Sequence, residues 1–291
     1  MGVNKINRFT QVIVPIFEID DKGLIKPNPL FHRPVDKLHS RCIEYPFAAS
    51  RIGDAKCILD VGTVKSAPAW ISWLENLPIE VYATDYDEPF KPFEKIKFYQ
   101  ADIRKLPIPD NTFDKVIAVS VIEHIGLKLP QVLTDKIPDV SEDGDLEAVR
   151  ELARVLKPGG ELIMTMPFGM KDDLILGNQA RSYTIDSIKN FDIVIKIVHL
   201  EYYEYQSKDM VENIRPLANV EQVSFRNKIY KKVKSLSGIA RFSKDQRHLL
   251  RVESDEVIGE VTWRNIPFSQ TRAVHRNHIE GVVCGVWKKV N

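Results

Sequence analysis

The chain has 291 residues, 44% of them hydrophobic, and a formal net charge of +1 at pH 7. This length is enough for one well-packed domain with an elaboration, or for two small domains. The balanced charge does not favour nucleic acid as a partner, and the three cysteines, Cys42, Cys57 and Cys284, lack the paired spacing of a disulfide framework or a zinc site. The longest apolar runs are far shorter than the about 18 residues of a transmembrane segment, and the first residues hold no apolar signal region. We therefore expect a cytoplasmic protein.

Residues 1–50 carry five prolines and little sustained periodicity. They predict an extended arm that packs on the main domain, with a short helix near 36–45. Two interpretations of its segment RCIEYPF (41–47) stay open. It either packs beneath a bound ligand or only holds the arm on the sheet.

From residue 57 onward, apolar strand patterns alternate with helical stripes, which predicts βαβ units and a doubly wound, mostly parallel sheet. Pro68 suits the first turn of one helix, and Thr184 is a candidate N-cap of another. The predicted strands are 57–61, 80–85, 95–102, 113–120, 161–168 and 192–201, and the helical stripes are Trp70, Trp73, Leu74 and Leu77, then Leu146, Val149, Leu152, Ala153 and Leu156, then the segment 184–190.

The last third is less regular, with GVVCGVWKK (281–289) as a final strand. About 80 residues separate it from the preceding strand, and an insertion of that length is more often functional than structureless. The predicted organisation is an arm at 1–50, a core at 51–201, a cap at 202–280 and the closing strand at 281–291.

Segment 226–251 of the predicted cap holds nine Lys or Arg residues and one acid. Three interpretations stay open: a surface helix with a solvated basic face, a cap that attracts an anionic substrate or a lipid headgroup, and nucleic-acid binding, which the scarcity of aromatic residues disfavours.

The candidate ligand site lies where four predicted strands end. In an open parallel sheet, ligands bind outside the carboxyl ends of the strands, where the strand order reverses. The residues found there are Asp60, Gly62 and Thr63, then Asp85, Tyr86 and Asp87, then Asp102 and Ile103, then Ser120, Glu123 and His124.

Each group of this site has a physical use. Gly62 lets the backbone approach a ligand closely, because it has no Cβ. Asp85 can accept hydrogen bonds from two ribose hydroxyls, and Asp102 can accept one from an adenine amino group, beside the apolar faces of Tyr86 and Ile103. Asp60 is placed to orient the glycine turn or to hold a ligand ammonium.

Four segments, ILDVG, VYATD, ADIRKLPIPDNTFDKVIAVSVIEHI and LARVLKPGGELIMTMPFG, resemble the successive motifs of class I methyltransferases that use S-adenosylmethionine (SAM), in the type 11-like group with an LPxPDxxFD segment. The resemblance covers roughly residues 40–200 and implies a seven-stranded Rossmann-like sheet whose last strand is antiparallel. By position it implies that Asp60, Gly62 and Thr63 form the SAM loop, Asp85 binds the ribose, Asp102 and Ile103 contact adenine, and Ser120 lies beside the methionine part.

One departure concerns the SAM loop. The family pattern continues with further glycines, but Val64 and Ser66 stand at those places. A Cβ at either position predicts a crowded or shifted loop. The same run argues against a dinucleotide dehydrogenase, whose G-x-G-x-x-G loop must approach a pyrophosphate.

His124 is the candidate general base, with a structural role at the following turn as the alternative. Glu123, Arg181 and Tyr183 are candidate substrate-side residues, with ordinary packing as the alternative. His275, His278 and Glu280 have a spacing compatible with a metal, but three residues in one loop are weak evidence, and no metal is predicted.

These observations predict a SAM-dependent methyltransferase, with O-methylation of a small molecule or a sugar or glycan precursor by in-line transfer. Segments near EYP and at the C-terminal end resemble those of methyltransferases of sugar and surface-glycan pathways, and a basic cap suits an anionic acceptor. The alternatives are a non-catalytic binding or scaffold protein with this fold, favoured by Val64 and Ser66, and an enzyme of the same fold with other chemistry. Peripheral membrane contact through 226–251 is compatible with the sequence, and the oligomeric state is not predicted.

Overall fold

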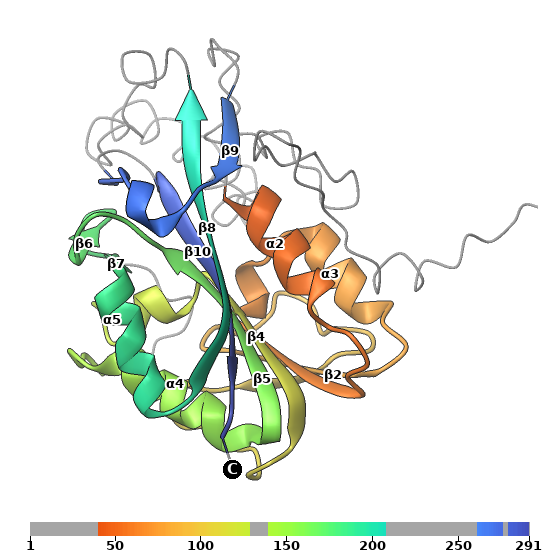
Figure 1. The fold of residues 1–291 in the computed structure, drawn as a ribbon. Coiled ribbons are helices and arrows are strands. Elements are labelled where there is room, and N and C mark those ends of the chain that lie inside the picture. Colours follow the sequence, from red (N-terminus) through yellow and green to blue (C-terminus); the bar gives the residue numbers. More distant parts are fainter. Residues whose placement is uncertain (1–39, 129–138, 208–260, 276–278, 291) are drawn as a thin grey trace, which may run out of the picture.

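The computed structural model describes residues 40–128, 139–207, 261–275 and 279–290. Its centre is a sheet of eight strands in the order β3-β2-β1-β4-β5-β10-β8-β9 (Figure 1). The strands are β1 (Cys57–Val61), β2 (Glu80–Asp85), β3 (Lys97–Gln100), β4 (Phe113–Val119), β5 (Leu156–Pro167), β8 (Lys196–Ser207), β9 (Val261–Asn265) and β10 (Gly281–Lys288).

The strand directions confirm the predicted doubly wound topology. Strands β1 to β5 pair in parallel, whereas β10 is antiparallel to both β5 and β8. The chain order reverses between β1 and β4, because β2 and β3 continue on one side of β1 and β5 continues on the other side of β4. Ligands of such sheets bind beyond the carboxyl ends of the strands at this reversal.

Helices cover both faces of the sheet. Helices α2 (Arg41–Ser50) and α3 (Pro68–Glu75) lie on one face, and α4 (Gly144–Val155) and α5 (Ile185–Lys189) lie on the other (Figure 1). Successive strand residues point to opposite faces, so Ile58 packs in the core beneath α2 and α3 while Leu59 packs in the core beneath α4. Burial on both faces explains why these strands are continuous apolar runs.

The helix starts agree with the sequence signals. Pro68 occupies the first turn of α3, where a missing N–H costs no helical hydrogen bond. Thr184 caps α5, and its hydroxyl and that of Ser187 form a reciprocal capping box.

Several features differ from the prediction. Leu156, predicted on a helical stripe, begins β5, and β8 begins at Lys196 instead of residue 192. The sheet has an eighth strand, β9, which pairs with the end of β8 because β8 continues to Ser207, past the predicted end at residue 201. The residues of β9 fall within the segment predicted as a cap, yet they extend the core sheet. A hairpin of β6 (Asp173–Ile175) and β7 (Ala180–Ser182) was not predicted, and α2 ends five residues beyond the helix expected at 36–45. Segment 226–251 lies outside the described residues.

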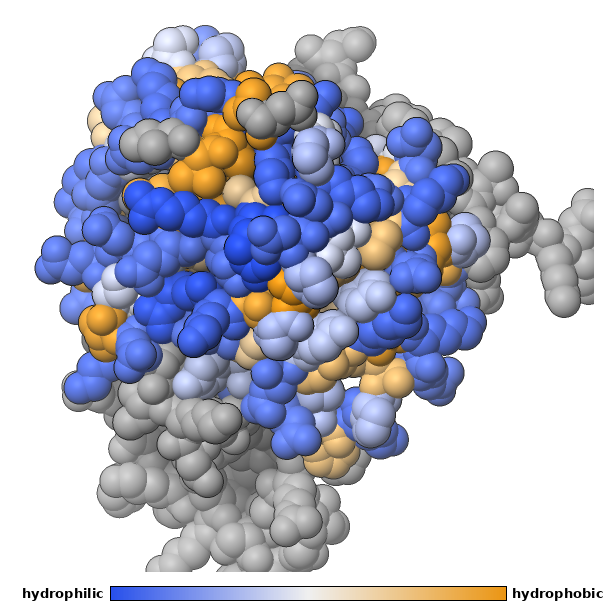
Figure 2. All heavy atoms as spheres, turned by 90° about the horizontal axis from the view of Figure 1, so that it is seen from below, coloured by the Kyte–Doolittle hydropathy of each residue, from blue (hydrophilic) through white to orange (hydrophobic). Residues whose placement is uncertain are grey.

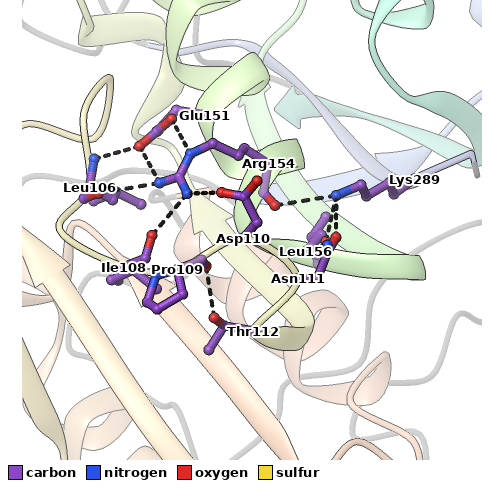
Figure 3. Close-up of polar contacts among 10 residues, drawn as sticks. All are labelled: Leu106, Ile108, Pro109, Asp110, Asn111, Thr112, Glu151, Arg154, Leu156 and Lys289. Atoms are coloured by element: carbon purple, nitrogen blue, oxygen red, sulfur yellow. Dashed lines mark hydrogen bonds and ion pairs between the residues drawn. The ribbon is translucent and has the colours of Figure 1, made fainter.

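The LPIPDNTFD segment is held by one arginine of α4 (Figure 3). The guanidinium of Arg154 donates to the carbonyls of Ile108 at 2.9 Å and Leu106 at 3.2 Å, and it pairs with Asp110 and Glu151. Glu151 in turn accepts from the Leu106 amide at 2.6 Å. This Arg154 clamp precedes β4, so it lies at the amino edge of the strands, opposite the predicted site.

The amino edge faces the viewer in Figure 2, because the strands β5 and β8 run upward in Figure 1. It is largely hydrophilic, with hydrophobic areas separated by polar ones. Among the described helices, none combines the length and the apolarity needed to cross a bilayer.

Candidate active site

The first strand ends in a turn that needs glycine at one position. Gly62 has φ +75°, and its amide donates to the carbonyl of Thr84 at 2.9 Å. A Cβ built on Gly62 would lie 2.5 Å from Cγ2 of Val121, so even alanine would clash with the chain leaving β4. The glycine therefore permits close packing of the two strand ends on either side of the reversal point.

Val64 and Ser66 fit the loop without any left-handed backbone. Residues Thr63–Lys65 form a single 3-10 turn, η2, and Ser66 leaves it with φ −67° and its amide 3.0 Å from the carbonyl of Thr63. Neither residue has a positive φ. The loop backbone therefore does not require the later glycines of the family pattern.

Asp85 bridges the loop and the end of β2. Its Oδ2 accepts from the Val64 amide at 2.9 Å, and its Oδ1 accepts from the Asp87 amide at 3.0 Å. Burial raises the pKa of Asp85, while these two amides oppose that rise. A carboxylate has about four acceptor positions, so about one remains on each oxygen. Asp87 is itself buried and pairs with Lys65 at 2.6 Å.

Asp60 serves the loop from within. Its oxygens accept from the Thr63 hydroxyl at 2.7 Å and from the Trp70 indole at 3.1 Å. Burial raises the pKa of Asp60 to about 7, against the lowering effect of these two hydrogen bonds. Of the two roles predicted for Asp60, the structure supports orientation of the turn.

Asp102 faces a fixed cation as well as the predicted adenine position. Its carboxylate is bound by the guanidinium of Arg104, with contacts of 2.6 to 3.1 Å, and by the Arg104 amide at 2.9 Å. The pKa of Asp102 is lowered, because these contacts outweigh the effect of burial. Ile103 is buried and Tyr86 is half-buried. Arg104 has no counterpart in the sequence prediction.

Ser120, at the end of β4, belongs to a buried network that the sequence analysis did not assign. Its hydroxyl donates to Oε1 of Glu44 at 2.6 Å, and the Thr165 hydroxyl donates to the same oxygen at 2.8 Å. Glu44 comes from α2, within the RCIEYPF segment. The available signal was an acid in an otherwise apolar stretch, and the structure shows that this acid joins the segment to β4 and β5.

Glu123 and His124 follow in η3 (Ile122–His124). Glu123 is 1% exposed, its Oε2 has no hydrogen-bond partner among the described residues, and burial raises its pKa to about 8. The carbonyl of Gln179 lies 2.5 Å from Nδ1 of His124 and can only accept, so Nδ1 carries the proton. Burial lowers the pKa of His124, which leaves Nε2 as an unprotonated acceptor at neutral pH.

Arg181 and Tyr183 do not stand free at the substrate side. The guanidinium of Arg181 donates to the carbonyls of Ile125 at 2.6 Å and Glu142 at 3.0 Å. The Tyr183 hydroxyl donates to Asp145 at 2.9 Å. Both residues therefore join the segment after β5 to residues near the start of α4, as residues with an ordinary packing role would.

The sequence predicts no metal in the loop that contains His275 and Glu280. Nδ1 of His275 accepts from the Glu280 amide at 3.1 Å, and Glu280 accepts from the Val274 amide at 3.1 Å. His278 lies outside the described residues. Within the described ranges, no group of three or more potential metal ligands occurs.

Comparison with known proteins gives matches to methyltransferases. Residues 59–164 match the model of a family described as a methyltransferase domain. The chain is 33% identical over 89 residues to the ubiquinone/menaquinone biosynthesis C-methyltransferase UbiE of Azotobacter vinelandii, which covers 31% of this chain and 28% of that protein. It is 38% identical over 68 residues to the sterol 24-C-methyltransferase ERG6B of Gibberella zeae, covering 23% and 13% respectively.

Among solved structures, a 1,6-didemethyltoxoflavin-N1-methyltransferase of Burkholderia thailandensis with bound S-adenosylhomocysteine is similar with a TM-score of 0.46 at 11% identity, over 85% of this chain and 77% of that chain. The chain spans less than half of the length of the curated relatives that it matches.

The doubly wound sheet, in which only β10 and the added strand β9 of the described residues run antiparallel to the rest, agrees with the fold predicted for class I methyltransferases. Residues 59–164 therefore match the methyltransferase-domain family, whose methyl donor is SAM.

Proposed function

We propose that this chain is a SAM-dependent methyltransferase that methylates a hydroxyl group of a small molecule or a sugar or glycan precursor. The observation that carries the proposal is Asp85. Its carboxylate is held by the amides of Val64 and Asp87 at the reversal point of the sheet, with about one acceptor position left on each oxygen. Two adjacent ribose hydroxyls are the donors that such a pair of positions fits.

The other residues of the rim suit the remaining parts of SAM. Gly62 and Thr63 present the loop, Tyr86 and Ile103 present apolar surface to the adenine, and Ser120 lies at the end of β4 for the methionine part. Asp102 contributes less acceptor capacity than the sequence pattern implies, because Arg104 occupies much of it. Asp60 contributes indirectly to the loop that would hold SAM, because it accepts from the Thr63 hydroxyl and so orients the turn.

SAM, when bound, supplies an electrophilic methyl group on a sulfonium. The protein then has to align a nucleophile with that methyl, exclude water and remove the hydroxyl proton. His124 suits the last task, because its Nδ1–H is fixed on the Gln179 carbonyl and its Nε2 is unprotonated.

Two classes of acceptor, a hydroxyl group and a carbon atom, are compared through His124. Matched relatives named as C-methyltransferases make a carbon acceptor the second candidate. The family match ends at residue 164, so it does not include Gln179, the hydrogen-bond partner of His124. His124 favours a hydroxyl, which gains more from a base than an activated carbon does. An anionic acceptor would suit the basic segment 226–251.

The test is methyl transfer from labelled SAM to a panel of phosphorylated and nucleotide-linked sugars and phenols, with His124→Asn beside the wild type. Asparagine can still donate to the Gln179 carbonyl but has no Nε2. We expect the rate constant of transfer to fall about 10²–10⁴-fold, with unchanged SAM affinity. Because the pKa of His124 is lowered, the wild-type rate should decline in an acid limb centred below the ordinary histidine pKa of about 6.5, and the variant should lack that limb. Equal rates for both proteins on a hydroxyl acceptor would rule out His124 as the base.

A further inference from the structure

Helix α2 contributes one fully buried acid to the carboxyl edge of the sheet. Glu44 is 0% exposed, and both of its oxygens are used. Oε2 accepts from the Ser40 hydroxyl at 2.8 Å and from the Arg41 guanidinium, while Oε1 accepts from Ser120 and Thr165. A buried carboxylate with four donors, one of them the cation Arg41, is satisfied, whereas one without them would be costly.

The donor from β4 has an unusual backbone. Ser120 has φ +48°, a left-handed conformation that is unfavourable for a residue with a Cβ. Its amide donates to the carbonyl of Thr165 at 3.0 Å and lies 3.1 Å from the Thr165 hydroxyl. Glu44 therefore bridges the two residues whose pairing fixes the chain as it leaves β4.

The same helix also contacts the other side of the predicted SAM loop. The Tyr45 hydroxyl accepts from the Ala67 amide at 3.0 Å, and the Tyr45 ring stacks on Trp70 with centroids 4.6 Å apart. Trp70 donates to Asp60, which orients Thr63. Adjacent residues of α2 thus reach both strand ends, β1 and β4, that flank the reversal point.

The charge of the cluster follows from these contacts. Burial opposes ionisation of Glu44, but Arg41 and the hydroxyl donors outweigh it and lower the pKa of Glu44. The negative charge of Glu44 adds to burial in raising the pKa of the neighbouring Glu123. Removal of the Glu44 charge should therefore lower the pKa of Glu123, which a purely steric role for Glu44 would not do.

We propose that α2 is an integral wall of the SAM site and that Glu44 is a positioning residue, which holds Ser120 in the left-handed conformation from which the end of β4 meets the methionine part of SAM. The inference rests on the proposed function for its link to SAM. The local part, that Glu44 fixes Ser120, stands on the geometry alone.

The experiment compares Glu44→Gln, Ser120→Ala, Ser120→Gly and the double variant Glu44→Gln/Ser120→Gly with the wild type. Two quantities are measured: hydrogen exchange of the Ser120 amide without ligand, and the SAM dissociation constant by calorimetry. Glu204→Gln is the matched control, because Glu204 is also a buried carboxylate with a tyrosine donor, Tyr202, at 2.6 Å, but lies on β8 outside this network.

Glu44→Gln and Ser120→Ala should each speed exchange of the Ser120 amide about tenfold or more and weaken SAM binding by a similar factor. Glycine adopts positive φ without cost, so Ser120→Gly should restore affinity in the Glu44→Gln background. The control variant should change neither quantity. If Glu44→Gln does not fold, Ser120→Ala and Ser120→Gly alone carry the comparison.

Unchanged hydrogen exchange of the Ser120 amide in Glu44→Gln and Ser120→Ala would overturn the positioning role of Glu44. Failure of Ser120→Gly to restore SAM affinity in the Glu44→Gln background would overturn it too. Altered exchange with unchanged SAM affinity would overturn the link between α2 and the SAM site. Failure of the wild type to bind SAM would instead contradict the proposed function, while the exchange measurement would still decide whether Glu44 holds Ser120.

Discussion

At the scale of single residues, the site is notable for carboxyl groups that burial keeps partly or wholly protonated. Glu123 has a pKa of about 8, against about 4.5 for the same group in solvent. Between those two values the folded protein holds a proton that the unfolded chain has released. Stability must therefore fall as pH rises through this window, and level off above the folded-state pKa.

Glu123→Gln should remove that contribution. Glutamine has the same shape and no charge to bury, so its free energy of unfolding should change less between pH 5 and pH 8 than that of the wild type, by up to about 3 kcal/mol. Urea denaturation of both proteins across this range measures the difference. Asp60, with a pKa of about 7, adds a similar slope to both proteins and cancels in the comparison. Parallel curves for the two proteins would contradict a buried neutral Glu123.

The sequence predicts which residues gather at the site better than it predicts their partners. Asp60, Gly62, Asp85, Asp102 and Ser120 are predictable because each ends a strand, and the carboxyl ends of parallel strands meet at one edge. Glu44 and Thr165 are 76 and 45 residues from Ser120 in the chain. No local periodicity encodes contacts over such separations, so their shared network emerges only from the packing.

At the scale of elements, the LPIPDNTFD segment has a structural explanation. Leu106 and Ile108 precede β4, and the Arg154 clamp supplies donors for both of their carbonyls, while Glu151 supplies an acceptor for the Leu106 amide (Figure 3). Unpaired polar groups at half-buried positions are costly, which is why an arginine with several donors suits this position of α4.

Arg154→Met should lower the free energy of unfolding by about 2 kcal/mol, because two carbonyls and two carboxylates lose a charged donor. SAM affinity should change less than twofold, since the clamp lies at the amino edge of the strands. Arg150→Met, an exposed position on the same helix, is the control and should be nearly neutral. Denaturant titration and calorimetry measure the two quantities. A large loss of SAM affinity without loss of stability would contradict a clamp confined to the amino edge.

Sequence patterns and structure differ most where an element depends on distant pairing. The long strands and the capped helix α5 follow from local periodicity and capping residues. The strand β9 and the hairpin of β6 and β7 are short, with five and three residues per strand, and their patterns are too brief to separate from loop. They form because β8 and the segment after β5 offer pairing partners.

At the scale of the whole molecule, the family match and the structure divide the chain in the same way. The matched segment, residues 59–164, contains the SAM loop and the strands from β2 to most of β5. The described α-helices and strands that lie wholly outside it are α2, β6 to β10 and α5. The family match therefore includes the predicted SAM residues, and it ends before the hairpin of β6 and β7.

Calorimetric titration of the protein with SAM tests whether the chain binds SAM through Asp85. Wild type, Asp85→Ala and the exposed control Asp186→Ala are compared, with S-adenosylhomocysteine as a second ligand. We expect the wild type and the control to bind SAM with a dissociation constant of about micromolar size. Asp85→Ala should lose SAM binding, because both oxygens that accept from the ribose hydroxyls are removed. Equal binding by Asp85→Ala would contradict the role of Asp85, and no binding by the wild type at millimolar SAM would contradict SAM as the ligand of this site.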